Sequence, residues 1–191
     1  MRGKNREKIL EAGYDLFYQN GFEATGVQEI ANASSVPKGS FYNYFSSKTN
    51  FAVEVIELYA DRQTAYLQEN LLQGDASPLT RLKDLFEDWE EQFFKVGAAG
   101  CLAGNLSQEL ANHEEPIRIA LHSALCRLEG FFVTIVRQAQ QAGEIPIDIG
   151  AEETGAFLYN GWQGAILRAK VTQNTDPMRH FINLVFTKVL K

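Results

Sequence analysis

Apolar residues recur at three- and four-residue intervals along almost the whole chain, and no stretch alternates as a half-buried strand would. Near the start, Ile9, Leu16 and Phe17 lie on one such stripe, which ends at Gly21, a residue suited to a left-handed helix cap. Continued along the chain, this pattern predicts an all-α fold of nine helices, at about residues 5–20, 25–33, 37–44, 47–72, 78–95, 101–113, 115–143, 151–172 and 176–191.

Residues typical of helix starts support several of these boundaries. Thr25, followed by Gln28 three residues later, has the spacing of a capping box. Ser77 precedes Pro78, and proline suits the first turn of a helix because its missing amide proton is not needed there. The predicted helices group into a three-helix head at residues 1–48 and a larger helical body at residues 49–191.

The second and third predicted helices meet through the segment NASSV, a length and spacing typical of a helix-turn-helix unit. The second helix of such a unit enters the DNA major groove. Gly39 and Ser40 are small enough for close approach to a duplex, while Phe41 and Phe45 would anchor the helix on the core of the head. Thr25 begins the preceding helix, where a phosphate is favoured. The donors expected to face DNA are Lys38, Tyr42, Asn43, Tyr44 and Lys48. The alternative is an ordinary surface helix with exposed tyrosines.

The distribution of charge fits contact with an anionic polymer at one end only. The chain has a net charge of −6, but its first 50 residues hold six Lys or Arg against five Asp or Glu. The remainder holds twelve against nineteen. A basic arm before an acidic body is the asymmetry expected of a protein whose head alone meets nucleic acid. A simply solvated amino-terminal arm is the other interpretation of the same charges.

Other classes of protein have little support in the sequence. No apolar run looks long enough to cross a bilayer, and the start lacks the apolar core of a secretory signal, so we expect a cytoplasmic protein. Cys101 and Cys126 provide neither a disulfide framework nor metal-ligand spacing. The three histidines lie in no catalytic motif, so we expect neither an enzyme nor a cofactor or metal site. A helical interaction protein or a small helical enzyme remains the alternative.

The segment NGFEATGVQEIANASSVPKGSFYNYFSSK closely resembles the amino-terminal signature of the TetR family of bacterial transcriptional regulators. The resemblance implies a homodimer, a palindromic double-stranded operator, and a small-molecule effector that releases the DNA, with repression as the usual outcome. It gives DNA-facing roles to Thr25, Lys38, Gly39, Ser40, Tyr42, Asn43, Tyr44 and Lys48. Asn43 departs from the family pattern, which often has histidine there, so its partner on the DNA stays open.

The last two predicted helices carry the faces through which the family dimerises, as paired helices from each subunit. Small residues in the eighth helix would let helices approach closely, and the ninth helix has an apolar stripe. The expected dimer residues are Phe157, Gly161, Gly164, Ala165, Arg168, Phe181, Leu184, Val185 and Lys188. These faces could instead complete the core of one subunit.

The segments GCLAGNLSQEL and NGWQGAILRAKV are similar to the electrophile-responsive, NemR-like branch of the family. That similarity makes Cys101 the candidate sensing thiol and Lys170 its cationic neighbour. The dipole at a helix N-terminus would also favour the thiolate of Cys101. A small buried hydrophobic role is the alternative for the same cysteine. The residues expected to line an effector pocket are Trp89, Phe93, Asn105, Tyr159 and Trp162, although such rings are also typical core residues.

Overall fold

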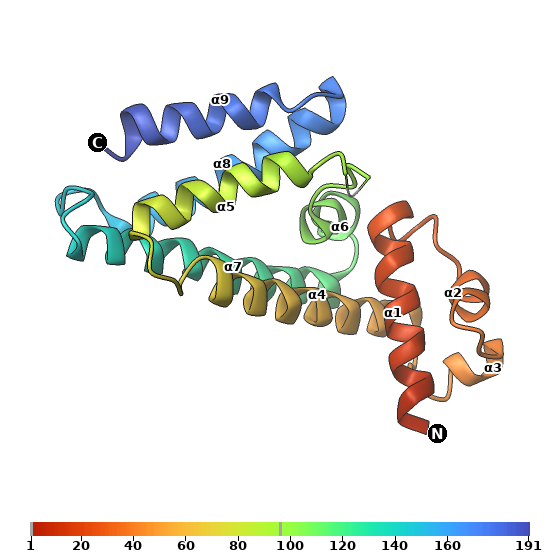
Figure 1. Cartoon of the computed structure of the whole chain (residues 1–191). Coiled ribbons are helices and arrows are strands. Elements are labelled where there is room, and N and C mark those ends of the chain that lie inside the picture. Colours follow the sequence, from red (N-terminus) through yellow and green to blue (C-terminus); the bar gives the residue numbers. More distant parts are fainter. Residues whose placement is uncertain (1, 96) are drawn as a thin grey trace. The chain divides into compact units, whose positions relative to one another are not determined.

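A computed structural model describes residues 2–95 and 97–191 of the chain. The described residues form nine α-helices and one π-helix, with no strand among them, which confirms the predicted all-α fold (Figure 1). The elements are α1 (Arg2–Asn20), α2 (Val27–Ala33), α3 (Lys38–Phe41), α4 (Lys48–Asn70), α5 (Pro78–Gln92), α6 (Leu102–Leu110), α7 (Glu115–Gln141), α8 (Ala151–Thr172), α9 (Asp176–Leu184) and the π-helix η1 (Val185–Val189).

Most helix ends lie where the sequence signals place them. Ser77 caps α5 by accepting a hydrogen bond from the Thr80 amide at 3.3 Å, and Pro78 is the first helical residue. Gly21 adopts a left-handed φ of +83° directly after α1. The helix predicted at 176–191 differs, because after α9 the chain is wound as a π-helix.

The capping box predicted at Thr25 is wrong. The N-cap of α2 is Gly26, which makes no side-chain capping bond. The hydroxyl of Thr25 instead donates to the carbonyls of Gly21 at 2.7 Å and Leu16 at 3.5 Å, so it closes the end of α1 rather than opening α2. The Thr25 side chain is fully buried as a result.

The chain divides into two compact units. Unit 1 comprises Met1–Asp61 and Cys101–Leu125, and unit 2 comprises Arg62–Gly100 and Cys126–Lys191. This division falls within α4 and α7 and therefore differs from the linear boundary expected after residue 48. Unit 1 thus combines the three-helix head with the start of α4, the whole of α6 and the start of α7.

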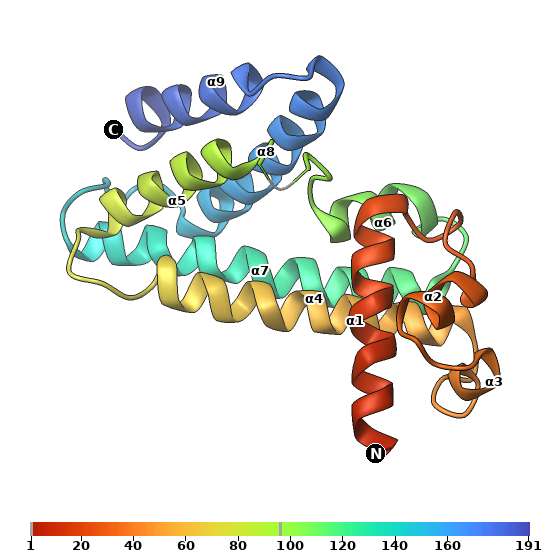
Figure 2. The same cartoon turned by 45° about the vertical axis from the view of Figure 1, so that its right-hand side comes forward.

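An aromatic cluster holds unit 1 together. Phe51 of α4 lies with its ring centroid 5.7 Å from that of Phe17, 5.1 Å from that of Phe41 and 4.8 Å from that of Phe45. All four rings are buried. Gly13 of α1 provides the space for Phe51, because a Cβ added there would lie 2.1 Å from its Cζ atom. The cluster joins α1, α3 and α4. Both views show α2 and α3 beside α1 (Figures 1 and 2).

Unit 2 has its own aromatic core. The ring of Phe86 in α5 lies 4.8 Å from Trp162 and 5.8 Å from Phe132, centroid to centroid. Gly155 lets α8 approach α7 closely, since a Cβ there would lie 2.6 Å from the backbone nitrogen of Val133. The helix α9 runs along α5 and α8 in both views (Figures 1 and 2).

By length and composition alone, α7 could span a membrane. This corrects the expectation that no segment is apolar enough. The core helix of a soluble protein has the same properties, and the apolar positions Ile117, Leu121, Leu128, Phe132 and Ile135 of α7 are buried inside the protein. Packing inside the protein therefore accounts for part of the apolar composition of α7.

Candidate DNA-binding surface and sensing site

The turn between α2 and α3 is held by a compact set of hydrogen bonds. The hydroxyl of Ser34 donates to the carbonyls of Ile30 at 2.8 Å and Ala31 at 3.0 Å. Ser35 takes a left-handed φ of +55°, and the amide of Val36 donates back to Ala31 at 3.0 Å. This geometry turns the chain sharply and starts α3 directly after Pro37.

The helix α3 separates its anchoring residues from its donors. Phe41 and Phe45 are buried, whereas Lys38, Gly39, Asn43 and Tyr42 are exposed, Tyr42 by 54%. Ser40 and Tyr44 are half-buried. The helix is shorter than predicted, because the Asn43 and Tyr44 amides bond three residues back, to Ser40 and Phe41. The turn that follows α3 therefore presents Tyr42 and Asn43 beside the helix.

Lys48, at the start of α4, packs its ammonium over an aromatic ring. The Nζ atom lies 4.0 Å from the centroid of Phe22, a distance typical of a cation–π interaction. Burial lowers the pKa of the Lys48 ammonium, while the carboxylates of Glu23 and Glu109 act in the opposite direction. Lys48 is half-buried and lies in unit 1 with the recognition helix.

Thr25 does not lie on this surface. Its side chain is fully buried, and its amide is bonded to the carbonyl of Phe22 at 3.1 Å. Neither donor can reach a phosphate in this conformation, which corrects the contact expected from its position before α2. The residue type alone led to this wrong prediction, because a threonine that precedes a helix can close the preceding helix as well as cap the next one.

Cys101 is the N-cap of α6 and is 8% exposed. Its sulfur accepts a hydrogen bond from the Gly104 amide at 3.3 Å. The Tyr59 hydroxyl lies 3.1 Å from the same sulfur, and either atom can donate. A thiolate at this position would therefore accept bonds from an amide and a phenol at the positive end of a helix.

Tyr18 of α1 interacts electrostatically with this thiol, and Tyr14 packs against Tyr18. Burial raises the pKa of the Tyr18 phenol, with smaller contributions from Tyr14 and Cys101. The rings of Tyr14 and Tyr18 stack with centroids 6.2 Å apart. Sequence reasoning did not identify Tyr18 or Tyr59 as neighbours of Cys101, because they come from α1 and α4 and no local motif joins them to α6.

Lys170, in unit 2, binds the segment that precedes Cys101 in the chain. Its ammonium donates to the Ala99 carbonyl at 3.0 Å. Gly100 has a left-handed φ of +86°, and a Cβ there would lie 3.0 Å from the Cδ atom of Lys170. Gly100 therefore provides both the turn and the space that this lysine needs.

The rings expected to line an effector pocket pack against other aromatic rings of unit 2. Trp162, Tyr159 and Phe93 are buried, and Trp89 is half-buried, with its ring centroid 5.8 Å from that of Trp162. Asn105, on α6 in unit 1, is half-buried. No group of three or more His, Cys, Asp or Glu residues suited to a metal occurs within residues 2–95 and 97–191.

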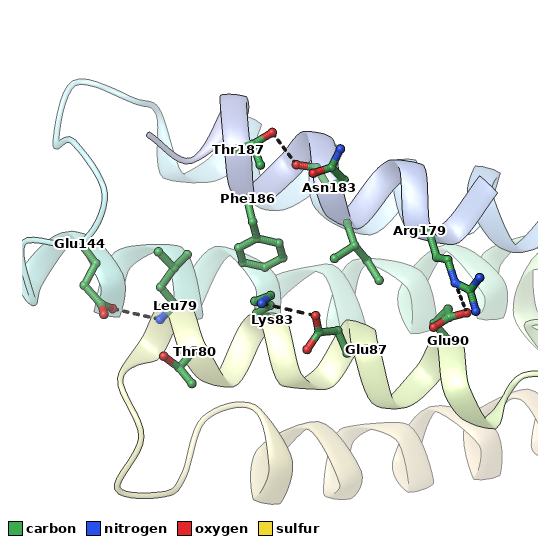
Figure 3. A pocket seen from close by; sticks show the side chains of 11 residues that line it. Leu79, Thr80, Lys83, Glu87, Glu90, Glu144, Arg179, Asn183, Phe186 and Thr187 are labelled. Carbon is green, nitrogen blue, oxygen red and sulfur yellow. Dashed lines mark hydrogen bonds and ion pairs between the residues drawn. The ribbon is translucent and has the colours of Figure 1, made fainter. Parts of the chain in front are cut away.

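A cavity of about 700 Å³ lies in unit 2, and none of the expected effector residues lines it. Figure 3 shows its walls, formed by α5 on one side and by α9 and η1 on the other. Ion pairs join Lys83 to Glu87 at 3.4 Å and Arg179 to Glu90 at 3.0 Å along its rim. Sequence reasoning missed this cavity because its lining residues form no motif.

Comparison with known proteins connects both parts of the chain to one class of protein. Residues 9–55 match the family described as bacterial regulatory proteins, tetR family, and residues 78–185 match the tetracyclin repressor-like C-terminal domain. The chain belongs to the TetR family. It is a DNA-binding transcriptional regulator of the helix-turn-helix type, with transcriptional repressors among its relatives.

Individual relatives cover nearly the whole chain. The transcriptional regulator AcuR of Cereibacter sphaeroides is 35% identical, over 92% of this chain and 80% of AcuR. The repressor DhaR of a Mycobacterium species is 33% identical, over 97% of this chain and 92% of DhaR. The crystal structure of Escherichia coli NemR in its reduced form superposes with a TM-score of 0.88 at 27% identity, covering 97% of each chain.

The TetR-family dimer residues expected on α8, α9 and η1 divide between surface and interior. Phe157, Gly164, Arg168, Leu184 and Lys188 are exposed. Ala165 and Val185 are buried in the subunit, and Gly161 and Phe181 are half-buried.

A Cβ added at Gly161 would lie 2.6 Å from the ring of Phe181. Gly161, Ala165, Phe181 and Val185 therefore take part in the packing of one subunit, whereas the other five expected residues lie at its surface.

Proposed function

We propose that this TetR-family regulator is a repressor that binds a palindromic operator as a homodimer and leaves it when an effector reaches the body. The observation that supports the proposal is that α3 and the following turn have one buried face and one exposed face. Phe41 and Phe45 are buried, while Lys38, Tyr42 and Asn43 are exposed beside the small Gly39. A helix that presents donors beside a glycine on its outer face suits insertion into the major groove.

The exposed donors differ in the groups of the DNA that they would contact. Tyr42 and Asn43, with directional hydroxyl and amide groups, suit contacts to phosphates or base edges. Lys38, Ser40 and Tyr44 would add contacts around the helix. Lys48 would place its charge on the DNA backbone. Thr25 has no direct contact in this proposal, because it is buried.

A gel shift with the chain's own upstream region tests the proposal. Phosphate contacts release counterions, so binding should weaken steeply as salt is raised. Tyr42→Ala and Lys38→Ala should weaken binding, whereas Lys83→Ala, an exposed lysine in unit 2, should leave it unchanged. Equal binding by all three variants and the wild type would rule out the proposed docking.

The dimer would form through the exposed face of α8 and α9. Phe157 and Leu184 are large apolar side chains that are about half exposed in the isolated subunit. A two-fold operator needs two recognition helices one turn of DNA apart, which a symmetric dimer supplies. Such a protein would work in the cytoplasm and by binding rather than by catalysis.

We further propose that the effector is a thiol-reactive electrophile and that Cys101 is its target. The Gly104 amide and the Tyr59 hydroxyl both lie within hydrogen-bond distance of the sulfur and would stabilise a thiolate. Addition to a maleimide would form a bond from the sulfur to one alkene carbon. The thiol proton would end on the neighbouring carbon, with no leaving group. NemR, which was crystallised in its reduced form, is similar to this chain over 97% of each chain.

Operator release by N-ethylmaleimide tests this assignment. The wild type and Cys126→Ser should release the operator, and Cys101→Ser should keep it. Equal release by the wild type and Cys101→Ser would remove the thiol from the mechanism. A noncovalent effector in the body is the second candidate, favoured by the cavity of about 700 Å³ between α5 and α9. In that case Phe186→Ala, which alters a residue that lines this cavity, should abolish the response and Cys101→Ser should retain it.

A further inference from the structure

The helix α6 reaches the turn between α1 and α2 through a single carboxylate. One oxygen of Glu109, Oε2, accepts a hydrogen bond from the Phe22 amide at 3.0 Å. The other oxygen, Oε1, accepts from the Glu23 amide at 2.6 Å. Both amides belong to the segment that leads into α2, and the carboxylate comes from 86 and 87 residues further along the chain.

The turn is shaped to receive this carboxylate. Gly21 has a φ of +83°, and a Cβ there would lie 2.9 Å from Oε2 of Glu109. Any other residue would strain the backbone, and the end of the Glu109 side chain would have to shift away from its Cβ. The Thr25 hydroxyl donates to the Gly21 carbonyl at 2.7 Å and fixes the other side of the turn.

The same carboxylate acts on a residue of the proposed DNA surface. The Lys48 ammonium lies over the ring of Phe22, whose amide Glu109 binds. Glu23 and Glu109 both interact electrostatically with this ammonium. The turn, the lysine and α6 therefore meet around Glu109.

We propose that Glu109 is a positioning residue that holds the helix-turn-helix in its DNA-binding orientation and links that orientation to α6. The inference rests on the proposed function, since it names how the DNA-reading helices are placed. Glu109 lies towards the end of α6, and Cys101 caps the start of the same helix. A shift of α6 caused at its N-terminus would thus move the support of the α1–α2 turn.

This contact differs from an ordinary surface ion pair. A surface ion pair joins two flexible side chains and contributes little. Glu109 instead binds two backbone amides whose positions the turn already fixes, and each bond is charge-assisted. Loss of the carboxylate would leave both amides without this partner and free the turn to open locally.

Three variants test the proposal: Glu109→Ala, Glu109→Gln, and the control Gln108→Ala, which alters the exposed neighbour on α6. Amide hydrogen exchange should speed up about tenfold at Phe22 and Glu23 in Glu109→Ala. The melting temperature should change little, because the contact is local. Glu109→Gln keeps one acceptor and should restore part of the protection, and Gln108→Ala should match the wild type.

Operator affinity provides the second measurement. Removal of a negative charge from unit 1 would by itself strengthen binding to DNA. Glu109→Ala should instead weaken operator binding about tenfold, because the recognition helix is no longer held in place. Glu109→Gln should recover most of that loss.

The outcomes separate this inference from the proposed function. Wild-type protein that binds no duplex would overturn the proposed function itself. If the wild type binds the operator and Glu109→Ala binds it equally or more tightly, only the proposed role of Glu109 is overturned. Unchanged exchange at Phe22 and Glu23 in Glu109→Ala would overturn it as well.

Discussion

The substitution Gly13→Ala should destabilise unit 1 although it places a better helix former within a helix. A Cβ at this position would lie 2.1 Å from Cζ and 2.3 Å from Cε1 of Phe51. The Phe51 ring cannot swing away freely, because Phe17, Phe41 and Phe45 pack against it. Either α1 or the ring must move, and both movements disturb the cluster that anchors α3.

The magnitude follows from two opposing effects. Overpacking of a well-packed core costs about 1–3 kcal/mol, and a contact this short belongs at the upper end. Alanine gains about 1 kcal/mol over glycine from helix propensity. The expected net loss is therefore about 2 kcal/mol, which lowers the melting temperature of a chain this long by about 4–8 °C.

Thermal unfolding followed by circular dichroism would measure this loss, with Gly130→Ala as the matched control. Gly130 is an exposed residue of α7 with no atom within 4 Å of an added Cβ, so this variant should be about 0.5–1 kcal/mol more stable. A double variant with Phe51→Ala should remove the clash and show a favourable coupling energy. If Gly13→Ala gained as much stability as Gly130→Ala, the proposed steric conflict would not exist.

Three further predictions concern other parts of the chain. Burial and a hydrogen bond to Asp88 raise the pKa of Tyr66 from 10.0 to about 12, so the unfolded chain loses this proton first. Stability should therefore fall between pH 10 and about 12, and urea unfolding of Tyr66→Phe should show a smaller fall. Leu184→Glu should change the sedimentation coefficient from that of a dimer to that of a monomer. The control Ile147→Glu should leave it unchanged, because Ile147 is 86% exposed and lies outside α8 and α9. Lys38→Ala should reduce the salt dependence of operator binding by about one counterion.

The local pattern of the sequence predicts the helices well. The limits of α8 and the start of α5 match the prediction, and α7 and α9 start within about one residue of it, because capping residues, proline and apolar spacing act within a few neighbouring residues. The shortened α3 and the terminal π-helix were not predicted. Both depend on which backbone groups pair after packing, and η1 follows α9 without a proline or glycine to mark the change.

The candidate sites depend more on tertiary contacts. The split between anchoring and exposed residues of α3 follows from the spacing of Phe41 and Phe45, so most of the DNA-facing set could be predicted. Thr25 was misplaced because its hydroxyl has two possible partners, and only packing selects one. Glu109 and Tyr59 were missed because their partners lie more than 40 residues away in the sequence. No periodicity indicates such pairings.

The position of Phe51 at the centre of the ring cluster has a consequence for the construction of hybrid regulators. A fragment that ends at residue 48 carries the complete signature but lacks the ring that Phe17, Phe41 and Phe45 surround. A hybrid that joins this DNA-binding head to the effector-binding body of another regulator would therefore need to include the first turns of α4 from this chain. It should preferably also include the segment that contains Glu109. A junction placed at the end of the linear motif would separate the DNA-binding helices from the residues of α4 and α6 that hold them in place.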